Sequence, residues 1–169
     1  MLMSKKYTNL IIILLAFLVA GCAQGISREG LRQVDEDITF NMLLENPQQY
    51  TGKTVLLGGE IIDLEILRQQ TEIIVLQHDL GFSNRPNPRS LSRGRFLVTT
   101  TQFLDPEIFR QGRWITVLGL ITGQEIRPVQ QNVYAYPVIA AREIQLWPVE
   151  RAVPARTRFG FGLGIGIGF

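Results

Sequence analysis

Cysteine and histidine are almost absent from this chain of 169 residues, which contains one of each. A single cysteine cannot form a disulfide within the chain, so the sequence predicts a fold stabilised by packing. A metal site needs several His, Cys, Asp or Glu residues at ligand spacing, and no such cluster accompanies His78, so no metal or other cofactor is expected. Asp79 follows His78, but no motif marks a nucleophile beside them. The pair is interpreted as lying at the surface, and no catalytic residue is predicted.

Long hydrophobic runs are also lacking. The apolar run from Leu10 to Ala20 has eleven residues, whereas a transmembrane helix needs roughly 20. Lys5 and Lys6 precede the run, and small residues follow it directly before Cys22. This order is typical of a secretory signal peptide, so residues 1–21 are predicted to be removed.

The segment Leu18-Val19-Ala20-Gly21-Cys22 resembles the lipobox of bacterial lipoproteins. This resemblance implies cleavage between Gly21 and Cys22 and attachment of a diacylglycerol to the Cys22 thiol. Because two or more acyl chains hold a protein stably on a bilayer, membrane lipid is the first predicted partner. Ala23 follows, not the aspartate that favours inner-membrane retention in enteric bacteria. The expected location is therefore the outer membrane, with the protein lipid-anchored and facing the periplasm.

Charge is balanced in the mature chain but unevenly placed. Without Lys5 and Lys6, 15 of the 17 basic residues remain against 15 acidic ones. Residues 22–80 hold 4 basic and 10 acidic side chains, whereas residues 81–169 hold 11 and 5. The asymmetry would suit an acidic partner such as lipopolysaccharide, but two halves folded against each other would cancel it, and we favour cancellation.

Composition divides the mature chain into three parts. Residues 22–37 are polar and are interpreted as a lipid-anchored linker, and residues 38–150 are long enough for one folded domain. Residues 151–169 form a tail, and from Phe159 onwards glycine alternates with Phe, Leu or Ile. The tail is either a flexible glycine-rich segment or a strand with one apolar face. Such a strand could pair with the edge of an outer-membrane barrel, enter the lipid interface or promote self-association.

The domain is predicted to be mainly β. Apolar spacing and Pro47 predict one short helix within residues 39–47. Five β-rich segments bounded by turn residues predict strands at residues 55–67, 72–77, 95–101, 114–123 and 138–147. Between the third and fourth strands, Asp105 and Pro106 predict a short helix over residues 105–110. This order favours a small five-stranded OB-like Greek-key barrel, with an open meander sheet as the alternative.

The first strand changes phase along its length. Glu60 is polar at an even position, whereas Asp63 and Glu65 are polar at odd ones. Such a change predicts a bulge or bend near Gly58 and Gly59. The three carboxylates could act as a glycosidase pair, but a solvated strand face is the plainer interpretation.

Three stretches of this domain resemble one family. They are GKTVLLGGEI (52–61), FLDPEIFRQGRWITVLGLITG (103–123) and YPVIAAREIQLWP (136–148). Together with the lipobox they resemble the Slp family of outer-membrane lipoproteins over roughly residues 18–150. The resemblance implies a lipid-anchored periplasmic protein associated with starvation and envelope stress, with no established catalytic reaction. The family tail is rich in tyrosine and tryptophan, and this chain departs from it there.

Basic residues gather in the loop from residue 81 to residue 95, where the candidates are Arg85, Arg89, Arg93 and Arg95. Either the loop is a solvated hairpin connection, or these arginines contact an anionic envelope partner such as lipopolysaccharide. Single-stranded nucleic acid, a common OB-fold ligand, is not expected, because it is scarce outside the cytoplasm and no aromatic residues are interleaved.

Two hypotheses for function follow. The favoured one is a non-enzymatic outer-membrane lipoprotein with a structural or stress-adaptive role, contacting other envelope components. The alternative is a periplasmic OB-like binding module that holds an anionic glycan or small ligand on strands two and three.

Overall fold

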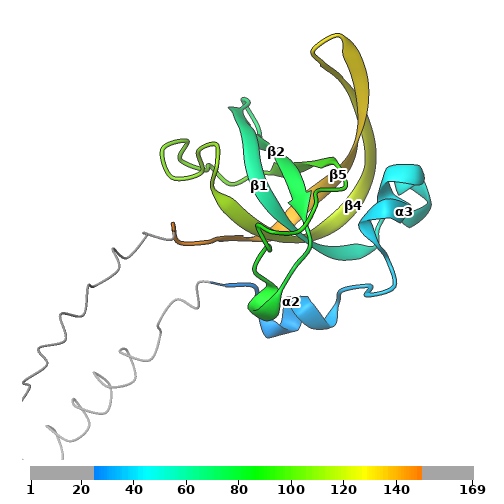
Figure 1. Cartoon of the computed structure of the whole chain (residues 1–169), viewed down its shortest axis with the longest axis vertical. Helices are drawn as coiled ribbons and strands as arrows, with labels where there is room; N and C mark the ends of the chain where they lie inside the picture. Colours follow the sequence, from blue (N-terminus) through cyan, green and yellow to red (C-terminus); the bar gives the residue numbers. More distant parts are fainter. Residues whose placement is uncertain (1–24, 150–169) are drawn as a thin grey trace, which may run out of the picture.

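The computed structural model describes residues 25–149, which form a β-barrel with short helices around it (Figure 1). The helices are α2 (Arg28–Arg32), α3 (Phe40–Glu45), η1 (Pro47–Tyr50) and η2 (Phe82–Asn84). The strands are β1 (Thr54–Ile66), β2 (Thr71–His78), β3 (Arg95–Thr100), β4 (Trp114–Val129) and β5 (Asn132–Leu146). All five predicted strands and the helix predicted within residues 39–47 are therefore present.

The strands close into a barrel in the order β1-β2-β3-β5-β4. β3 and β5 pair in parallel, and the other neighbours pair antiparallel. This is the Greek-key connectivity of an OB-like barrel, which confirms the predicted fold class. An open meander is wrong because β4 returns to pair with β1, and this pairing closes the sheet.

The barrel interior is a continuous apolar core. Ile61, Ile73 and Val98 are fully buried in it, and they come from β1, β2 and β3. Helix α3 contributes Phe40, whose ring lies edge-on to that of Phe96 with the centroids 6.0 Å apart. Because burying each such side chain contributes roughly 1.5–3 kcal/mol, α3 is part of the core and not a surface appendage.

The predicted irregularity of β1 is a register shift against β2. Ile61 pairs with Val75, but Asp63 pairs with Ile74, so Ile62 is the extra residue. The bulge reverses which side chains face the core, as the phase change predicted. It lies a few residues after Gly58 and Gly59, which have a different role described below.

The segment predicted as a helix over residues 105–110 is a single turn. The Asp105 carbonyl accepts hydrogen bonds from the amides of Ile108 and Phe109 (3.0 and 2.8 Å), and the Asp105 carboxylate accepts one from the amide of Glu107 (2.9 Å). Asp105 therefore caps the turn as expected, but no helix follows it. Forming the first helical turn is unfavourable, because it fixes many backbone angles for few hydrogen bonds, and only the formation of further turns offsets it.

Part of the predicted linker is folded onto the barrel. Ser27 caps α2 by accepting a hydrogen bond from the Gly30 amide (2.9 Å). Glu143 of β5 accepts hydrogen bonds from the amide and the hydroxyl of Ser27, each 2.6 Å long. A Cβ at Gly30 would lie 2.6 Å from Leu118 Cδ2, so a larger residue there would require the Leu118 side chain to shift. Within the described part of residues 22–37, the predicted linker is thus packed against β4 and β5.

Strands β4 and β5 extend well beyond their predicted ends. The extra residues pair from Gln124 with Pro137 to Val129 with Asn132. This β4–β5 arm (residues 124–137) projects from the barrel on the right-hand side of Figure 1, in yellow to gold. Pro128 and Pro137 lie within it, and proline in a β-rich run argues against a strand, so the sequence offered little indication of the arm.

Candidate functional site

A cleft of about 220 Å³ lies where three distant parts of the chain meet. We call it the Trp-Arg cleft, and it is lined by Arg85, Pro86, Pro88, Gly112, Arg113, Trp114, Trp147, Pro148 and Val149. The first three belong to the loop between β2 and β3. Gly112 and Arg113 directly precede β4, and Trp114 is its first residue, while the last three follow β5.

Strand pairing brings the two tryptophans of the chain together. Because β4 and β5 are antiparallel, the first residues of β4 lie beside the last of β5, with Ile115 opposite Leu146. The Trp147 amide donates a hydrogen bond to the Trp114 carbonyl (2.9 Å). The two aromatic residues therefore stand at the same end of the barrel.

Hydrogen bonds fix the β2–β3 loop against these residues. The Trp147 indole donates to the Thr116 hydroxyl (2.9 Å), which in turn donates to the Asn84 carbonyl (2.7 Å). Gly58 of β1 lies beneath the loop, and a Cβ there would be 2.8 Å from Pro86 Cγ. The two hydrogen bonds thus hold the loop against Trp147, and the absence of a side chain at Gly58 leaves room for Pro86.

Two arginines provide positive charge in the cleft. The Arg85 guanidinium lies 5.5 Å from the centre of the Trp147 ring, within the range of a cation–π contact. The Arg113 guanidinium donates to the carbonyls of Ile108 and Trp147, both at 3.0 Å. Its Nε is buried and has no hydrogen-bond partner within residues 25–149. Flat aromatic surface beside fixed guanidinium groups suits a sugar ring that carries an anionic group.

His78 is buried behind this cleft, with 8% of its surface exposed. Its Nδ1 lies 3.3 Å from the Ser90 hydroxyl, and its ring packs edge-on against Trp114 with centroids 4.9 Å apart. The expectation of a surface pair with Asp79 is therefore wrong for His78, although Asp79 itself is exposed. Ser90 belongs to the loop that follows β2, so this loop covers the His78 side chain.

The four predicted arginines have different surroundings. Arg85 lines the Trp-Arg cleft, whereas Arg89 is exposed on the same loop. Arg93 pairs with Asp79 at 3.8 Å and lines a second groove beside His78. Arg95 opens β3, and its amide donates to the Tyr134 hydroxyl (2.8 Å). An anionic contact through all four arginines remains a prediction, and Arg85 is the one placed in a cleft with aromatic residues.

The β1 carboxylates do not meet in a pocket. Asp63 and Glu65 are exposed and Glu60 is half-buried. Within residues 25–149, no group of three or more His, Cys, Asp or Glu is placed to hold a metal ion. The same part of the chain contains no helix with the length and apolar character needed to cross a membrane. Gly21, Cys22 and the tail at residues 151–169 lie outside the described residues.

The outer face of β2 and β3, the expected OB binding face, is contacted by the β4–β5 arm. Arg127 of the arm forms an ion pair with Glu72 of β2, whose side chain is 7% exposed. Tyr134 of the arm accepts the Arg95 amide hydrogen bond at the start of β3. Leu97 points away from the core between Phe96 and Val98 and is nonetheless fully buried. The arm therefore occupies surface that the alternative hypothesis assigned to a ligand.

Sequence reasoning missed Trp114, Trp147 and Arg113 as site residues. One signal was available: the only two tryptophans stand at the start of the fourth and the end of the fifth predicted strand. Antiparallel pairing of these strands would have brought them together. The predicted OB-like barrel implies this pairing, but the prediction was not carried through to the two tryptophans.

Comparison with known sequences points to one family. The sequence model of the outer membrane lipoprotein Slp family matches residues 19–162. An uncharacterized protein of Haemophilus influenzae is 35% identical over 85% of this chain and 78% of its own length. The outer membrane protein Slp of Escherichia coli is 27% identical over 85% of this chain and 76% of its own. The uncharacterized lipoprotein YeaY of Escherichia coli is 28% identical over 66% of this chain and 57% of its own.

Comparison with solved structures returns single-stranded-DNA-binding proteins. The mitochondrial protein Rim1 of S. cerevisiae aligns over 56% of this chain and 94% of its own, with 13% identity and a TM-score of 0.34. A Plasmodium falciparum SSB in complex with ssDNA aligns over 56% and 91%, with 13% identity and a TM-score of 0.33. At such low identity and TM-score, nothing about DNA binding transfers to this chain.

Proposed function

Because the chain belongs to the outer membrane lipoprotein Slp family, we propose that it is a lipid-anchored protein of the bacterial outer membrane. It faces the periplasm and has a structural or stress-adaptive role there without catalysing a reaction. Acylated Cys22 is the anchor in this proposal. The family match begins at residue 19 and therefore includes Cys22, which supports the assignment.

The observation that carries this proposal is the attachment of the N-terminal segment to the barrel. The Ile26 amide donates to the Gln145 side chain (3.2 Å), and Ser27 is held by Glu143. Arg142 of the same strand donates to Gln33 at the other end of the segment (2.9 Å). A lipid on Cys22, three residues before Gly25, would thus hold the barrel itself at the membrane.

Metabolic labelling tests the anchor. Cells expressing the full chain are grown with radiolabelled palmitate, and their inner and outer membranes are separated on a density gradient. The wild type should carry label and sediment with the outer membrane. Cys22→Ala should lose both, whereas Ala23→Ser, which keeps the cysteine, should lose neither. Label that persists in Cys22→Ala, or an unlabelled wild type, would rule out the anchor.

The geometry of the Trp-Arg cleft favours a second candidate, a binding module for an anionic glycan. Its support is the Arg85 guanidinium 5.5 Å from the centre of the Trp147 ring, both of which line the cleft. Unlike the β2–β3 face, this cleft is not contacted by the β4–β5 arm. A sugar would pack against the tryptophan and proline side chains that line the cleft, while its carboxylate or phosphate accepts hydrogen bonds from the Arg85 guanidinium.

Calorimetric titration with an oligogalacturonate, and with a neutral glucan of equal length, tests this candidate. The acidic sugar should bind in preference to the neutral one. Arg85→Gln should weaken binding about tenfold, equivalent to about 1.4 kcal/mol. Arg89→Gln, an exposed arginine four residues away, is the matched control and should bind as the wild type does. Equal affinity for both sugars, or no effect of Arg85→Gln, would exclude the cleft as an anionic-glycan site.

A further inference from the structure

Four large apolar side chains are exposed on two neighbouring loops. Ile66 and Leu67, at the turn between β1 and β2, are 44% and 38% exposed. Phe103 and Ile108, on the loop between β3 and β4, are 73% and 50% exposed. Isolated exposed apolar residues are ordinary, but a contiguous group marks a surface that contacts something apolar.

Two grooves show that these side chains and the start of the described chain share one surface. A groove of about 270 Å³ separates the β1–β2 turn from Phe103, and Gln102 is part of its wall. Gln102 also lines a second groove, of about 540 Å³, together with Ile108 and Gly25. Gln102 therefore joins the groove beside Leu67 and Phe103 to the groove that contains Ile108 and Gly25.

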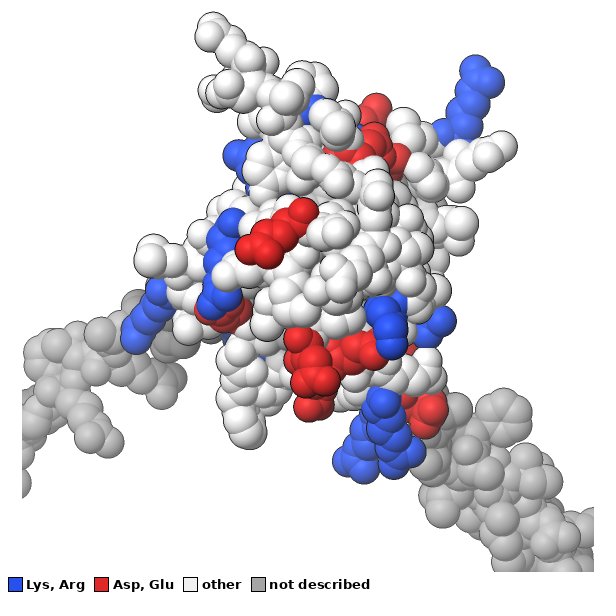
Figure 2. Space-filling model, turned by 90° about the vertical axis from the view of Figure 1, so that its right-hand side faces the viewer, with Lys and Arg blue, Asp and Glu red and all other residues white. Residues whose placement is uncertain are grey.

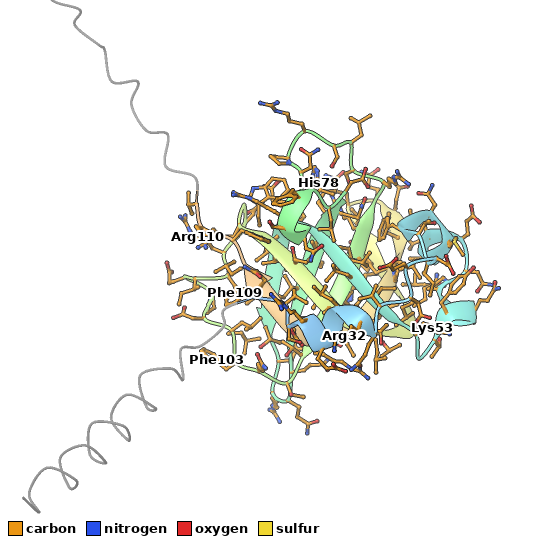
Figure 3. All side chains as sticks on the ribbon, turned by 90° about the horizontal axis from the view of Figure 1, so that it is seen from below. Arg32, Lys53, His78, Phe103, Phe109 and Arg110 are labelled. Carbon is orange, nitrogen blue, oxygen red and sulfur yellow. The ribbon has the colours of Figure 1, made fainter. Side chains whose placement is uncertain are left out.

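Figure 3 places the labelled Phe103, Phe109 and Arg110 on the left of the barrel, the side on which the described chain both starts and stops. Figure 1 shows the β4–β5 arm on the opposite side. Ile126 and Val133 of that arm are also exposed, at 68% and 77%. The molecule therefore has one apolar surface near the anchor end and a comparable apolar pair far from it.

The length of chain between Cys22 and Gly25 limits the distance from the lipid to the barrel. Three residues span at most roughly 10 Å when fully extended. Ile26 and Ser27 are hydrogen-bonded to Gln145 and Glu143 of β5. A bilayer that holds the acyl chains of Cys22 must therefore lie beside the surface next to Gly25.

We propose that Ile66, Leu67, Phe103 and Ile108 form a membrane-docking surface that inserts into the phospholipid interface of the leaflet carrying acylated Cys22. This inference rests on the proposed lipid anchor. Amphipathic surfaces bind such interfaces by burying apolar side chains at the boundary between headgroups and acyl chains.

The charges beside the surface indicate that insertion is driven by the burial of apolar side chains and not by electrostatic attraction. Arg68 and Arg110 are exposed there, but Asp105 and Glu107 are exposed on the same β3–β4 loop. These four charges cancel, so attraction to anionic lipid is weak. Docking should therefore persist in high salt and in vesicles of neutral phospholipid.

An environment-sensitive fluorophore on a single introduced cysteine tests the docking surface. In the acylated protein the Cys22 thiol is blocked, so Phe103→Cys or Ile108→Cys provides the one thiol for labelling. The full lipidated chain is inserted into phosphatidylcholine vesicles. The emission of fluorophores at positions 103 and 108 should be blue-shifted and should be quenched by a spin label in the bilayer. Iodide should quench these fluorophores several-fold less than it quenches the same fluorophore free in buffer.

Val133→Cys, on the outer face of the arm, is the matched control because its side chain is as exposed as Phe103. Its fluorophore should stay accessible to iodide. Equal iodide quenching at positions 103, 108 and 133 in protein that mass spectrometry shows to be acylated would overturn the docking surface and leave the anchor intact. Protein that is not acylated would instead contradict the proposed anchor. Leu67→Cys replaces either labelled variant if that variant does not fold.

Discussion

At the scale of single residues, two glycines in the strands allow close backbone approach. A Cβ at Gly59 of β1 would lie 2.0 Å from the Leu76 carbonyl oxygen on β2. A Cβ at Gly119 of β4 would lie 2.4 Å from the Ala140 carbonyl oxygen on β5. The obstructing atoms belong to the backbone of a paired strand, so no rotamer change can relieve the contact. Both positions therefore require glycine because a side chain does not fit there, and not because the backbone turns.

Gly59→Ala should lower the free energy of unfolding by about 3 kcal/mol, because the strand must shift to admit the methyl group. Urea unfolding followed by far-ultraviolet circular dichroism measures the change. Gly81→Ala is the matched control, because the nearest atom to its Cβ would be 3.6 Å away. That variant should stay within about 0.5 kcal/mol of the wild type. Similar losses in the two variants would show that backbone crowding is not the cause.

At the scale of elements, the β4–β5 arm is held to the barrel by polar contacts. Arg127 bonds both Glu125 of the arm and Glu72 of β2. These hydrogen bonds, with that to Glu125 the larger influence, raise the pKa of the Arg127 guanidinium above its ordinary value. Glu72 also accepts a hydrogen bond from Gln70 (2.6 Å). The arm is thus docked by an ion pair that is largely shielded from water.

Arg127→Gln should destabilise the protein by about 1–3 kcal/mol, because it leaves the Glu72 carboxylate short of a partner where water has little access. Amide hydrogen exchange should also become faster in residues 124–137. Arg89→Gln, at an exposed position, provides the comparison and should change neither quantity. Unchanged exchange in the arm would mean that the ion pair does not hold it.

At the scale of the whole molecule, the acidic and basic halves of the sequence share one barrel. β1 and β2 come from the acidic half and β3, β4 and β5 from the basic half. Arg127 pairs with Glu72 and Arg93 with Asp79, and both pairs join the two halves. Figure 2 shows both signs of charge interspersed on the face it presents. The charge asymmetry is thus partly cancelled by folding, as the favoured interpretation held.

Because one core unites all five strands, unfolding should be a single cooperative transition. Trp114 and Trp147 report on one end of the barrel by fluorescence, while far-ultraviolet circular dichroism reports on the strands throughout. The two signals should give the same urea midpoint within error. A fluorescence midpoint clearly below that of circular dichroism would mean that the Trp-Arg cleft opens before the barrel unfolds.

Local features of the fold were predictable because neighbouring residues determine them. Alternation and turn residues predicted five strands, and the phase change between Glu60 and Asp63 predicted the bulge that β1 contains. Asp105 was correctly identified as a capping residue. The helix predicted after it is a single turn, because one capping residue does not decide whether further turns form.

The sequence by itself determined which segments form strands, the family and the expected lipid attachment at Cys22, since each is read from short stretches of residues that need no knowledge of strand pairing. Only the tertiary structure decided that α2 packs on β5, that the arm contacts β2 and that Arg85, Arg113 and Trp147 meet in one cleft. These contacts join residues separated by 28 or more positions. Barrel closure creates them, because pairing β4 with β1 and β5 with β3 brings distant segments to the same end of the molecule.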